Sequence, residues 1–205
     1  MGILDLLIPG GRALDLCLGL SALGWAAAGL VAAWPDPSAP TLAIAALHAS
    51  AGLLFLRRRV PIEGPRTVGA LAALPALLLG AAAWRLGPAP ADWPLWTGRI
   101  LVLATLWTCW SLLSLGESFA VLPARRALVT RGPYRLVRHP AYLGELLALQ
   151  TVGAASMRPA IQALCAAAAL PVMLRIFVEE QALAADPGWQ AYAAAVRWRL
   201  IPGLW

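Results

Sequence analysis

The chain alternates between long apolar segments and short polar stretches. A transmembrane helix needs about 20 apolar residues, with roughly 17–25 tolerated, and six segments approach that length. They cover residues 13–34, 41–56, 67–84, 96–115, 141–157 and 160–178. The last two segments are separated only by Arg158 and Pro159, which predicts a tight antiparallel hairpin. The pattern therefore predicts an all-α, polytopic membrane helical bundle of about six spans.

Two polar islands interrupt the carboxyl-terminal half of this pattern. The first island, residues 131–144, holds three arginines, two of the three tyrosines and one of the two histidines. The second island, residues 175–180, closes the sixth apolar segment. Ionisable residues at membrane depth are costly and are functional candidates by default. Because the hairpin returns the second island to the side of the first, we expect the two islands to form one active site.

Composition supports a membrane protein and argues against other classes. Only 13% of the residues are charged, against about 25% in soluble domains. The net charge of +6 comes from arginines in short loops between apolar segments, which is typical of membrane topology rather than of a nucleic-acid surface. The three cysteines are scattered and form no motif with histidine, so no metal site is expected. The length predicts a single membrane domain over residues 1–205.

The arginines also predict an orientation, because cytoplasmic loops carry the excess of basic residues. Most arginines fall on the side that holds both islands, whereas Arg85, Arg99 and Arg158 fall on the other. Both termini and both islands are therefore expected on the cytoplasmic side. All sixteen basic residues are arginines in an alanine-rich chain. This composition is typical of a high-GC bacterial genome, so the expected location is a bacterial plasma (inner) membrane.

In the first island, the spacing of polar residues predicts one helix face. Pro140 suits the first position of a helix, which puts His139 at or near the helix cap. Tyr142 and Glu145 then follow at spacings of three, and residues so spaced are neighbours on a helix surface. The alternative interpretation is that the arginines and tyrosines only anchor the chain at the membrane surface.

In the second island, Arg175 and Glu179 share one helix face, whereas Glu180 points about 100° away from Glu179. The alternative for this pair is an ordinary ion pair worth roughly a few tenths of a kcal/mol. We favour function for Arg175 because it lies deeper than Glu179. His48, alone in a short alanine-rich segment, is interpreted as a packing residue, and Asp15 as a residue near the membrane interface.

A resemblance to a known family rests on residues 115–205. These residues contain, in order, LVTRGPYRLVRHPAYLG, RIFVEEQAL and DPGWQAYAAAVRWRLIPG. The combination of G-x-Y, R-H-P-x-Y-x-G and R-x-x-x-E-E-x-x-L resembles the isoprenylcysteine carboxyl methyltransferases and their relatives, the membrane phospholipid N-methyltransferases. The resemblance implies amino-terminal spans over residues 1–115 and a methyltransferase-like catalytic half over 116–205, with S-adenosylmethionine bound in a cytoplasmic-side pocket.

The resemblance also implies roles for individual residues. The implied cofactor contacts are Arg126, Ala127, Leu128, Val129, Tyr134, His139, Pro140, Ala141, Tyr142 and Glu179. Arg175 is implied to orient the substrate, so Arg175 and Glu179 are the expected catalytic residues. Phe177 and Val178 stand before Glu179 where the carboxylate-methylating members carry a longer acidic run. This departure puts the substrate in doubt more than the cofactor.

The expected reaction is methyl transfer to a lipophilic acceptor, such as the carboxylate or thiol of an isoprenoid, a prenylcysteine or a lipid-like molecule. Transfer from a sulfonium is an in-line displacement, so positioning and desolvation supply much of the catalysis. One alternative is an NADPH-dependent sterol- or steroid-type reductase, whose cofactor phosphates the five arginines between residues 125 and 138 would bind. A second alternative is a non-catalytic membrane partner protein. Neither nucleic acid nor an obligate protein partner is expected.

Overall fold

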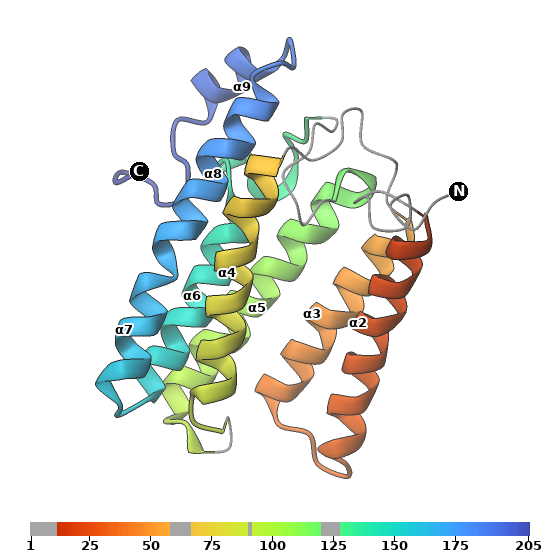
Figure 1. Cartoon of the computed structure of the whole chain (residues 1–205), viewed down its shortest axis with the longest axis vertical. Helices are drawn as coiled ribbons and strands as arrows, with labels where there is room; N and C mark the ends of the chain where they lie inside the picture. Colours follow the sequence, from red (N-terminus) through yellow and green to blue (C-terminus); the bar gives the residue numbers. More distant parts are fainter. Residues whose placement is uncertain (1–11, 58–66, 90–91, 120–127) are drawn as a thin grey trace.

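The computed structural model describes residues 12–57, 67–89, 92–119 and 128–205, and within these ranges the chain is helical and contains no strand. The helices are α2 (Arg12–Ala32), α3 (Ala39–Arg57), α4 (Thr67–Leu86), α5 (Leu95–Leu115), η2 (Gly116–Ser118), η3 (Gly132–Arg135), α6 (Pro140–Ala155), α7 (Pro159–Ala167), α8 (Ala169–Leu183) and α9 (Trp189–Ala195). Figure 1 shows α2 and α3 as a pair beside a larger group formed by α4 to α8. The fold class predicted from the sequence, an all-α bundle, is confirmed for these residues.

Each of the six predicted segments contains a helix. Four helical segments are long and apolar enough to cross a membrane: Arg12–Ala32, Ala39–Arg57, Leu95–Ser118 and Pro159–Leu183. The protein is therefore a membrane protein with transmembrane helices. α4 and α6 are not among these four segments, and α6 has only 16 residues. That α4 and α6 cross the membrane therefore stays a prediction. The count of six spans and the membrane hairpin stay predictions as well.

The sixth predicted segment lies within one candidate span, Pro159–Leu183, which a short interruption divides into two helices. α7 ends at Ala167 and α8 begins at Ala169. Pro171 lies four residues after Ala167, so it supplies no backbone N–H for the Ala167 carbonyl, and its ring crowds that carbonyl. A proline is tolerated in the first turn of a helix, so α8 starts around it. α8 contains the whole second island, residues 175–180.

Small residues set how closely the helices approach. A Cβ atom built on Gly52 of α3 would lie 2.9 Å from the carbonyl oxygen of Gly19 in α2. A Cβ atom on Gly144 of α6 would lie 2.9 Å from the carbonyl oxygen of Ala104 in α5 and would overlap the Thr108 hydroxyl. Contact this close is typical of membrane helices that pack through small residues. Gly144 thus seats the first turns of α6 directly on α5.

Gly144→Ala is expected to lower the free energy of unfolding by about 1–3 kcal/mol, because the added methyl group overpacks the contact between α5 and α6. The matched control is Gly24→Ala on α2, where a Cβ atom meets nothing within 4 Å and the substitution raises helix propensity. Thermal unfolding of both variants in one detergent, followed by tryptophan fluorescence, measures the difference. Equal melting temperatures for the two variants would show that the α5–α6 contact is looser than described.

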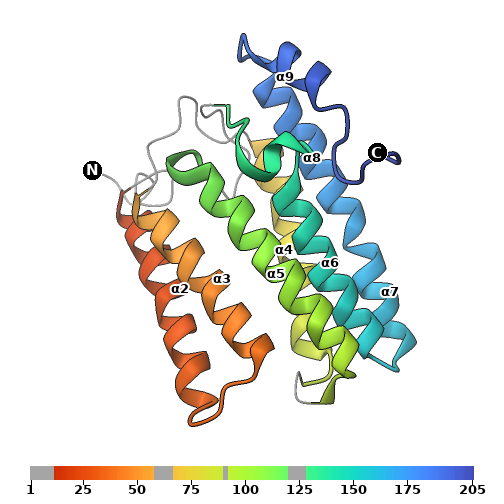
Figure 2. The ribbon, with the colours of Figure 1, turned by 180° about the vertical axis from the view of Figure 1, so that it is seen from behind.

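The helix directions bring both polar islands to one end of the bundle. Figure 1 and, from behind, Figure 2 show η3, the start of α6, the end of α8 and α9 at the same end. Backbone hydrogen bonds then join the first island to the carboxyl-terminal segment: Arg138 N–H donates to the Trp198 carbonyl and His139 N–H to the Arg199 carbonyl, each at 2.9 Å. The two islands and residues 198–205 therefore form one layer over this end.

Candidate active site

A cavity of about 380 Å³ opens between α3, α5, η3, α6 and α8. We call it the donor cavity. Its apolar wall includes Phe55 of α3 and Phe119, which pack edge to face with ring centroids 5.1 Å apart. The polar residues of η3, α6 and α8, together with the helix cap His139, form what we call its polar wall: Tyr134, His139, Tyr142, Glu145, Arg175 and Glu179. His48, Thr105 and Thr108 line the cavity from α3 and α5. A concave, mostly apolar space with a few convergent polar groups is the usual form of a small-molecule site, for which about 300–1,000 Å³ is typical.

The facing surfaces of α6 and α8 supply the charged groups of this cavity. The Tyr142 hydroxyl donates a 2.7 Å hydrogen bond to Glu179 Oε2. The guanidinium carbon of Arg175 lies 4.8 Å from the centroid of the Tyr142 ring, a cation–π contact. Glu145 Oε2 lies 3.8 Å from the Arg175 guanidinium. The spacings of three on α6 and four on α8 thus place an aromatic ring, a cation and two carboxylates around one space.

Glu180 does not line the cavity; it leaves α8 about 100° from Glu179 and binds three partners, of which His139 lines the cavity and Arg138 and Arg199 do not. Glu180 Oε1 accepts from Arg138 at 3.0 Å and from His139 Nε2 at 3.2 Å. Glu180 Oε2 accepts from the Arg199 guanidinium at 2.9 Å. Charge-assisted hydrogen bonds of this kind are the strong ones. One carboxylate therefore ties the first island, α8 and the carboxyl-terminal segment together.

The turn that carries Tyr134 is held by α5 and by α9. Gly132 has φ +60°, and a Cβ atom there would collide with the Ser114 hydroxyl of α5, so only glycine fits this position. From the other side, the Tyr192 hydroxyl of α9 donates a 2.8 Å hydrogen bond to the Tyr134 carbonyl. Burial, followed by the nearby charge of Glu179, raises the pKa of Tyr134 well above its ordinary value. Tyr134 therefore keeps its proton at neutral pH and presents a neutral hydroxyl.

The residues expected to bind the cofactor fall into three groups. Tyr134, His139, Ala141, Tyr142 and Glu179 line the donor cavity together with Arg175. Leu128, Val129 and Pro140 do not line it: Leu128 lies beside Gly188 at the α8–α9 connection, and the buried Pro140 accepts a 2.8 Å hydrogen bond from Trp107 through its carbonyl. Arg126 and Ala127 lie outside the described residues. The geometry brings one group together, and cofactor binding by any of these residues stays a prediction.

A second cavity, of about 410 Å³, adjoins the donor cavity. We call it the apolar chamber, because its walls are mainly aliphatic side chains of α3, α4, α5, α6 and α8. Five residues line both spaces: Leu47, His48, Thr105, Glu145 and Ala148. The shared wall shows that the two spaces are neighbours within the bundle. Of the five, only His48 and Glu145 are titratable.

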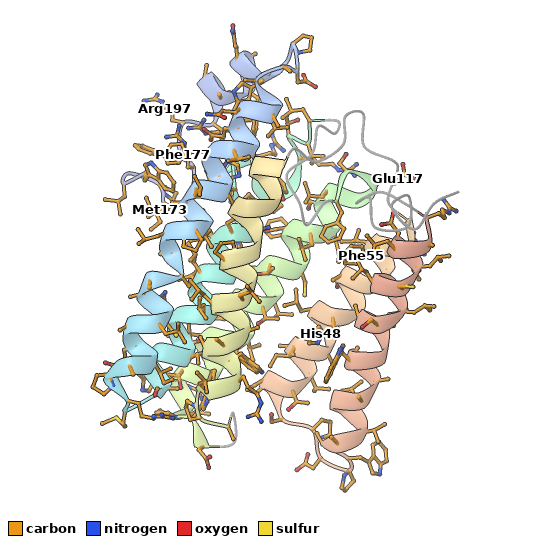
Figure 3. All side chains as sticks on the ribbon, in the orientation of Figure 1. His48, Phe55, Glu117, Met173, Phe177 and Arg197 are labelled. Atoms are coloured by element: carbon orange, nitrogen blue, oxygen red, sulfur yellow. The ribbon has the colours of Figure 1, made fainter. Side chains whose placement is uncertain are left out.

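Sequence reasoning assigned no site role to His48, Glu145 or Glu180. His48 was interpreted as packing, but it lines both spaces from α3, about midway along the helix in Figure 3. A usable signal was present, since residues 44, 47, 48, 51 and 55 follow helical spacing and all line one of the two spaces. Glu145 was noticed only for its spacing from Tyr142. Asp15 is buried in the first turn of α2, and its expected place near the membrane interface stays a prediction.

Comparison with known proteins gives one match. Residues 93–186 match the family model described as phospholipid methyltransferase. A search of the curated proteins gave no match. The matched range is just under half of the chain and includes α5, both islands and the polar wall of the donor cavity. This part of the chain is thus similar to phospholipid methyltransferases, and the match supports a membrane methyltransferase in general.

Proposed function

We propose that the protein is an S-adenosylmethionine-dependent methyltransferase that acts on a lipophilic acceptor within the membrane, as a member of the isoprenylcysteine carboxyl methyltransferase family or its phospholipid-methylating relatives. The observation that carries the proposal is the donor cavity with its neighbouring apolar chamber. The polar wall of the donor cavity falls within the residues that match the phospholipid methyltransferase model. A polar, partly aromatic site for the donor and an apolar space for the acceptor are what such a reaction requires.

The chemistry of the donor cavity fits S-adenosylmethionine. When bound, this cofactor supplies a methyl group on a positively charged sulfonium. The ring of Tyr134 gives that charge a π-face, and the Glu179 carboxylate is an acceptor for the hydroxyl or amino groups of the cofactor. The Tyr142 hydroxyl already donates to Glu179, which fixes the carboxylate in place. Burial of the site by Phe55 and Phe119 keeps water away from the reactive methyl group.

Arg175 fits the role of orienting the acceptor. It lies in the wall of the donor cavity, stacked on Tyr142, so its guanidinium is held at one position. A cation there stabilises an acceptor carboxylate or thiolate within reach of the methyl group. The apolar chamber begins next to it and is large enough for a hydrocarbon chain. The carboxylate or thiol of an isoprenoid, a prenylcysteine or a lipid-like molecule matches both features.

The same end of the bundle would face the cytoplasm of a bacterium, with the protein in the plasma membrane. Two observations support this orientation: the islands and α9 share one end (Figure 1), and the sequence pattern assigns most of the arginines to the side of the islands. A cofactor made in the cytoplasm then reaches the donor cavity directly.

The reductase alternative invoked five arginines, of which Arg131, Arg135 and Arg138 belong to the described residues. Arg138 binds Glu180, and Arg131 donates to the Ser114 carbonyl. None of these three arginines lines the donor cavity, so none is placed to bind a cofactor phosphate there.

Calorimetry on the protein in lipid nanodiscs tests the proposal. S-adenosylhomocysteine, the product form of the cofactor, is expected to bind at a single site, and NADPH is expected not to bind. Binding of NADPH alone would favour the reductase, and binding of neither would favour a non-catalytic membrane protein. Either result removes the methyltransferase proposal.

A further inference from the structure

Glu145 occupies the boundary between the donor cavity and the apolar chamber. It lies on α6, one helical turn after Tyr142, and lines both spaces. Its side chain is 41% accessible, so neighbouring side chains do not enclose it. Among the described residues, Glu145 forms an ion pair with Arg175, in which Oε2 lies 3.8 Å from Nη1. This distance is longer than a hydrogen bond. The carboxylate oxygens therefore keep acceptor capacity toward the cavities.

Glu179, the other carboxylate of the site, is placed differently. It lines the donor cavity but not the apolar chamber, and it accepts the Tyr142 hydroxyl at 2.7 Å. An acceptor that enters through the apolar chamber meets Glu145 first. The two glutamates therefore lie at different positions in the site. Glu179 lies on the cofactor side, and Glu145 lies at the junction of the two cavities.

The ionisable groups of the cavity bear on the acceptor. Among the described lining residues, Arg175 is the one arginine, whereas two glutamates, Glu145 and Glu179, face the same space. An acceptor carboxylate would lie beside these like groups in a medium of low dielectric, which is costly. A protic acceptor group can instead donate its proton to a glutamate carboxylate, which narrows the acceptor of the proposed function to its protic members.

His48 faces the same junction from α3. It lines both spaces beside Leu47, and Figure 3 shows it further from the island end of the bundle than Phe55. An imidazole has one donor and one acceptor nitrogen when neutral, so it can hold a polar head at the mouth of the apolar chamber. α3 lies outside residues 93–186, so this contribution comes from the part of the chain that the family match does not cover.

We propose that the acceptor is an amine or a thiol at the end of an apolar chain, with a proton on its nucleophilic atom. The Glu145 carboxylate takes this proton, and His48 positions the head of the acceptor. This inference rests on the proposed function. In the step, the nitrogen or sulfur of the acceptor forms a bond to the methyl carbon while the bond from that carbon to the sulfonium sulfur breaks and its electron pair stays on that sulfur. The proton leaves the acceptor for Glu145, so charge and atoms balance.

The stability of the transferred label tests the class of acceptor without knowledge of its identity. The protein is incubated with membrane lipid extract and methyl-labelled S-adenosylmethionine, and the labelled lipid is treated with mild alkali. A methyl ester of a carboxylate releases volatile labelled methanol, whereas an N-methyl or S-methyl product keeps its label. Retention of the label is expected. Release of most of it as methanol would overturn the inference while leaving the proposed function intact, and absence of any incorporated label would count against both.

Variants of Glu145 test the proton transfer. General-base catalysis contributes about 10²–10⁴-fold, so Glu145→Gln is expected to lower kcat on dodecanethiol by about 100-fold or more and Glu145→Asp by less. On the more acidic 4-dodecylthiophenol, which ionises without help, the loss is expected to be much smaller. Asp36→Asn is the matched control, because Asp36 is exposed between α2 and α3 and lines neither cavity. Equal losses on both thiols would show a structural role and overturn the assignment of Glu145.

Binding measurements provide a readout that does not depend on turnover. S-adenosylhomocysteine affinity of Glu145→Gln is expected to stay within a few-fold of the wild type, because the cofactor side is held by Glu179. With S-adenosylhomocysteine bound, the wild type is expected to bind dodecanethiol more tightly than dodecanoate, and Glu145→Gln is expected to reduce that preference. His48→Leu is expected to raise the KM for the acceptor and to leave kcat nearly unchanged. Tighter binding of dodecanoate by the wild type would contradict the charge argument.

Discussion

Glu180→Ala is expected to unfold the site end of the bundle and to abolish measurable binding of S-adenosylhomocysteine. The carboxylate binds Arg138, His139 and Arg199, and it is only 9% exposed. Removal of one member of a buried ionic cluster costs about 3–5 kcal/mol, because the remaining charges lose their compensation. The first island and the carboxyl-terminal segment would separate from α8, and the wall of the donor cavity would lose its support.

Thermal unfolding and calorimetry measure these two effects. Glu180→Gln is the informative companion, since it keeps hydrogen-bond acceptor capacity while removing the charge, and an intermediate melting temperature is expected. Asp36→Ala removes an exposed carboxylate between α2 and α3 and is expected to leave both measurements unchanged. A Glu180→Ala protein with wild-type melting temperature and cofactor affinity would show that the three cationic partners do not depend on this carboxylate.

Glu179→Ala and Arg175→Ala are expected to separate cofactor binding from turnover. Loss of a hydrogen bond to a charged group costs about 1.5–3 kcal/mol, so Glu179→Ala should weaken S-adenosylhomocysteine binding by about 10–100-fold. Arg175→Ala should leave that affinity within a few-fold of the wild type and lower kcat, because the acceptor is no longer held next to the methyl group. Calorimetry and a methyl-transfer assay on the same preparations give both quantities.

Arg175 also stacks on Tyr142, so its removal can disturb folding as well as turnover. Arg175→Lys controls for this, since it keeps the charge but loses the planar stack, and each variant is compared with the wild type in melting temperature. Equal S-adenosylhomocysteine affinity in the wild type and Glu179→Ala would show that Glu179 is wrongly assigned to the cofactor. Full turnover by a folded Arg175→Ala protein would show the same for the acceptor.

The helices were largely predictable because their signal is local. Runs of apolar residues of membrane length marked all six segments, and Pro140 marked the start of α6 within the first island. The break between α7 and α8 was missed, although Pro171 carried the signal, because the run from residue 160 to 178 is apolar throughout. The run of apolar residues predicts a helix but does not show where that helix is interrupted. The interruption is predicted only from the hydrogen bond that Pro171 cannot donate to the carbonyl four residues earlier.

The site was predictable only in part, since its contacts join residues that are distant in sequence. Spacing placed Arg175 and Glu179 on one face of α8 and Glu180 on another, which the structure bears out. Spacing does not reveal what the other face meets: Arg199, which binds Glu180, lies in the segment after α9. In the same way, helical spacing groups His48 with its neighbours on one face of α3, but spacing does not show that this face docks on α5.

The most direct test of the central claim is transfer of label from methyl-labelled S-adenosylmethionine to membrane lipid extract by the protein in nanodiscs. The account predicts label in the organic phase, dependent on time and protein, and strongly reduced by Arg175→Ala. Absence of organic-phase label from a folded wild-type protein across extracts of several bacterial membranes would contradict it.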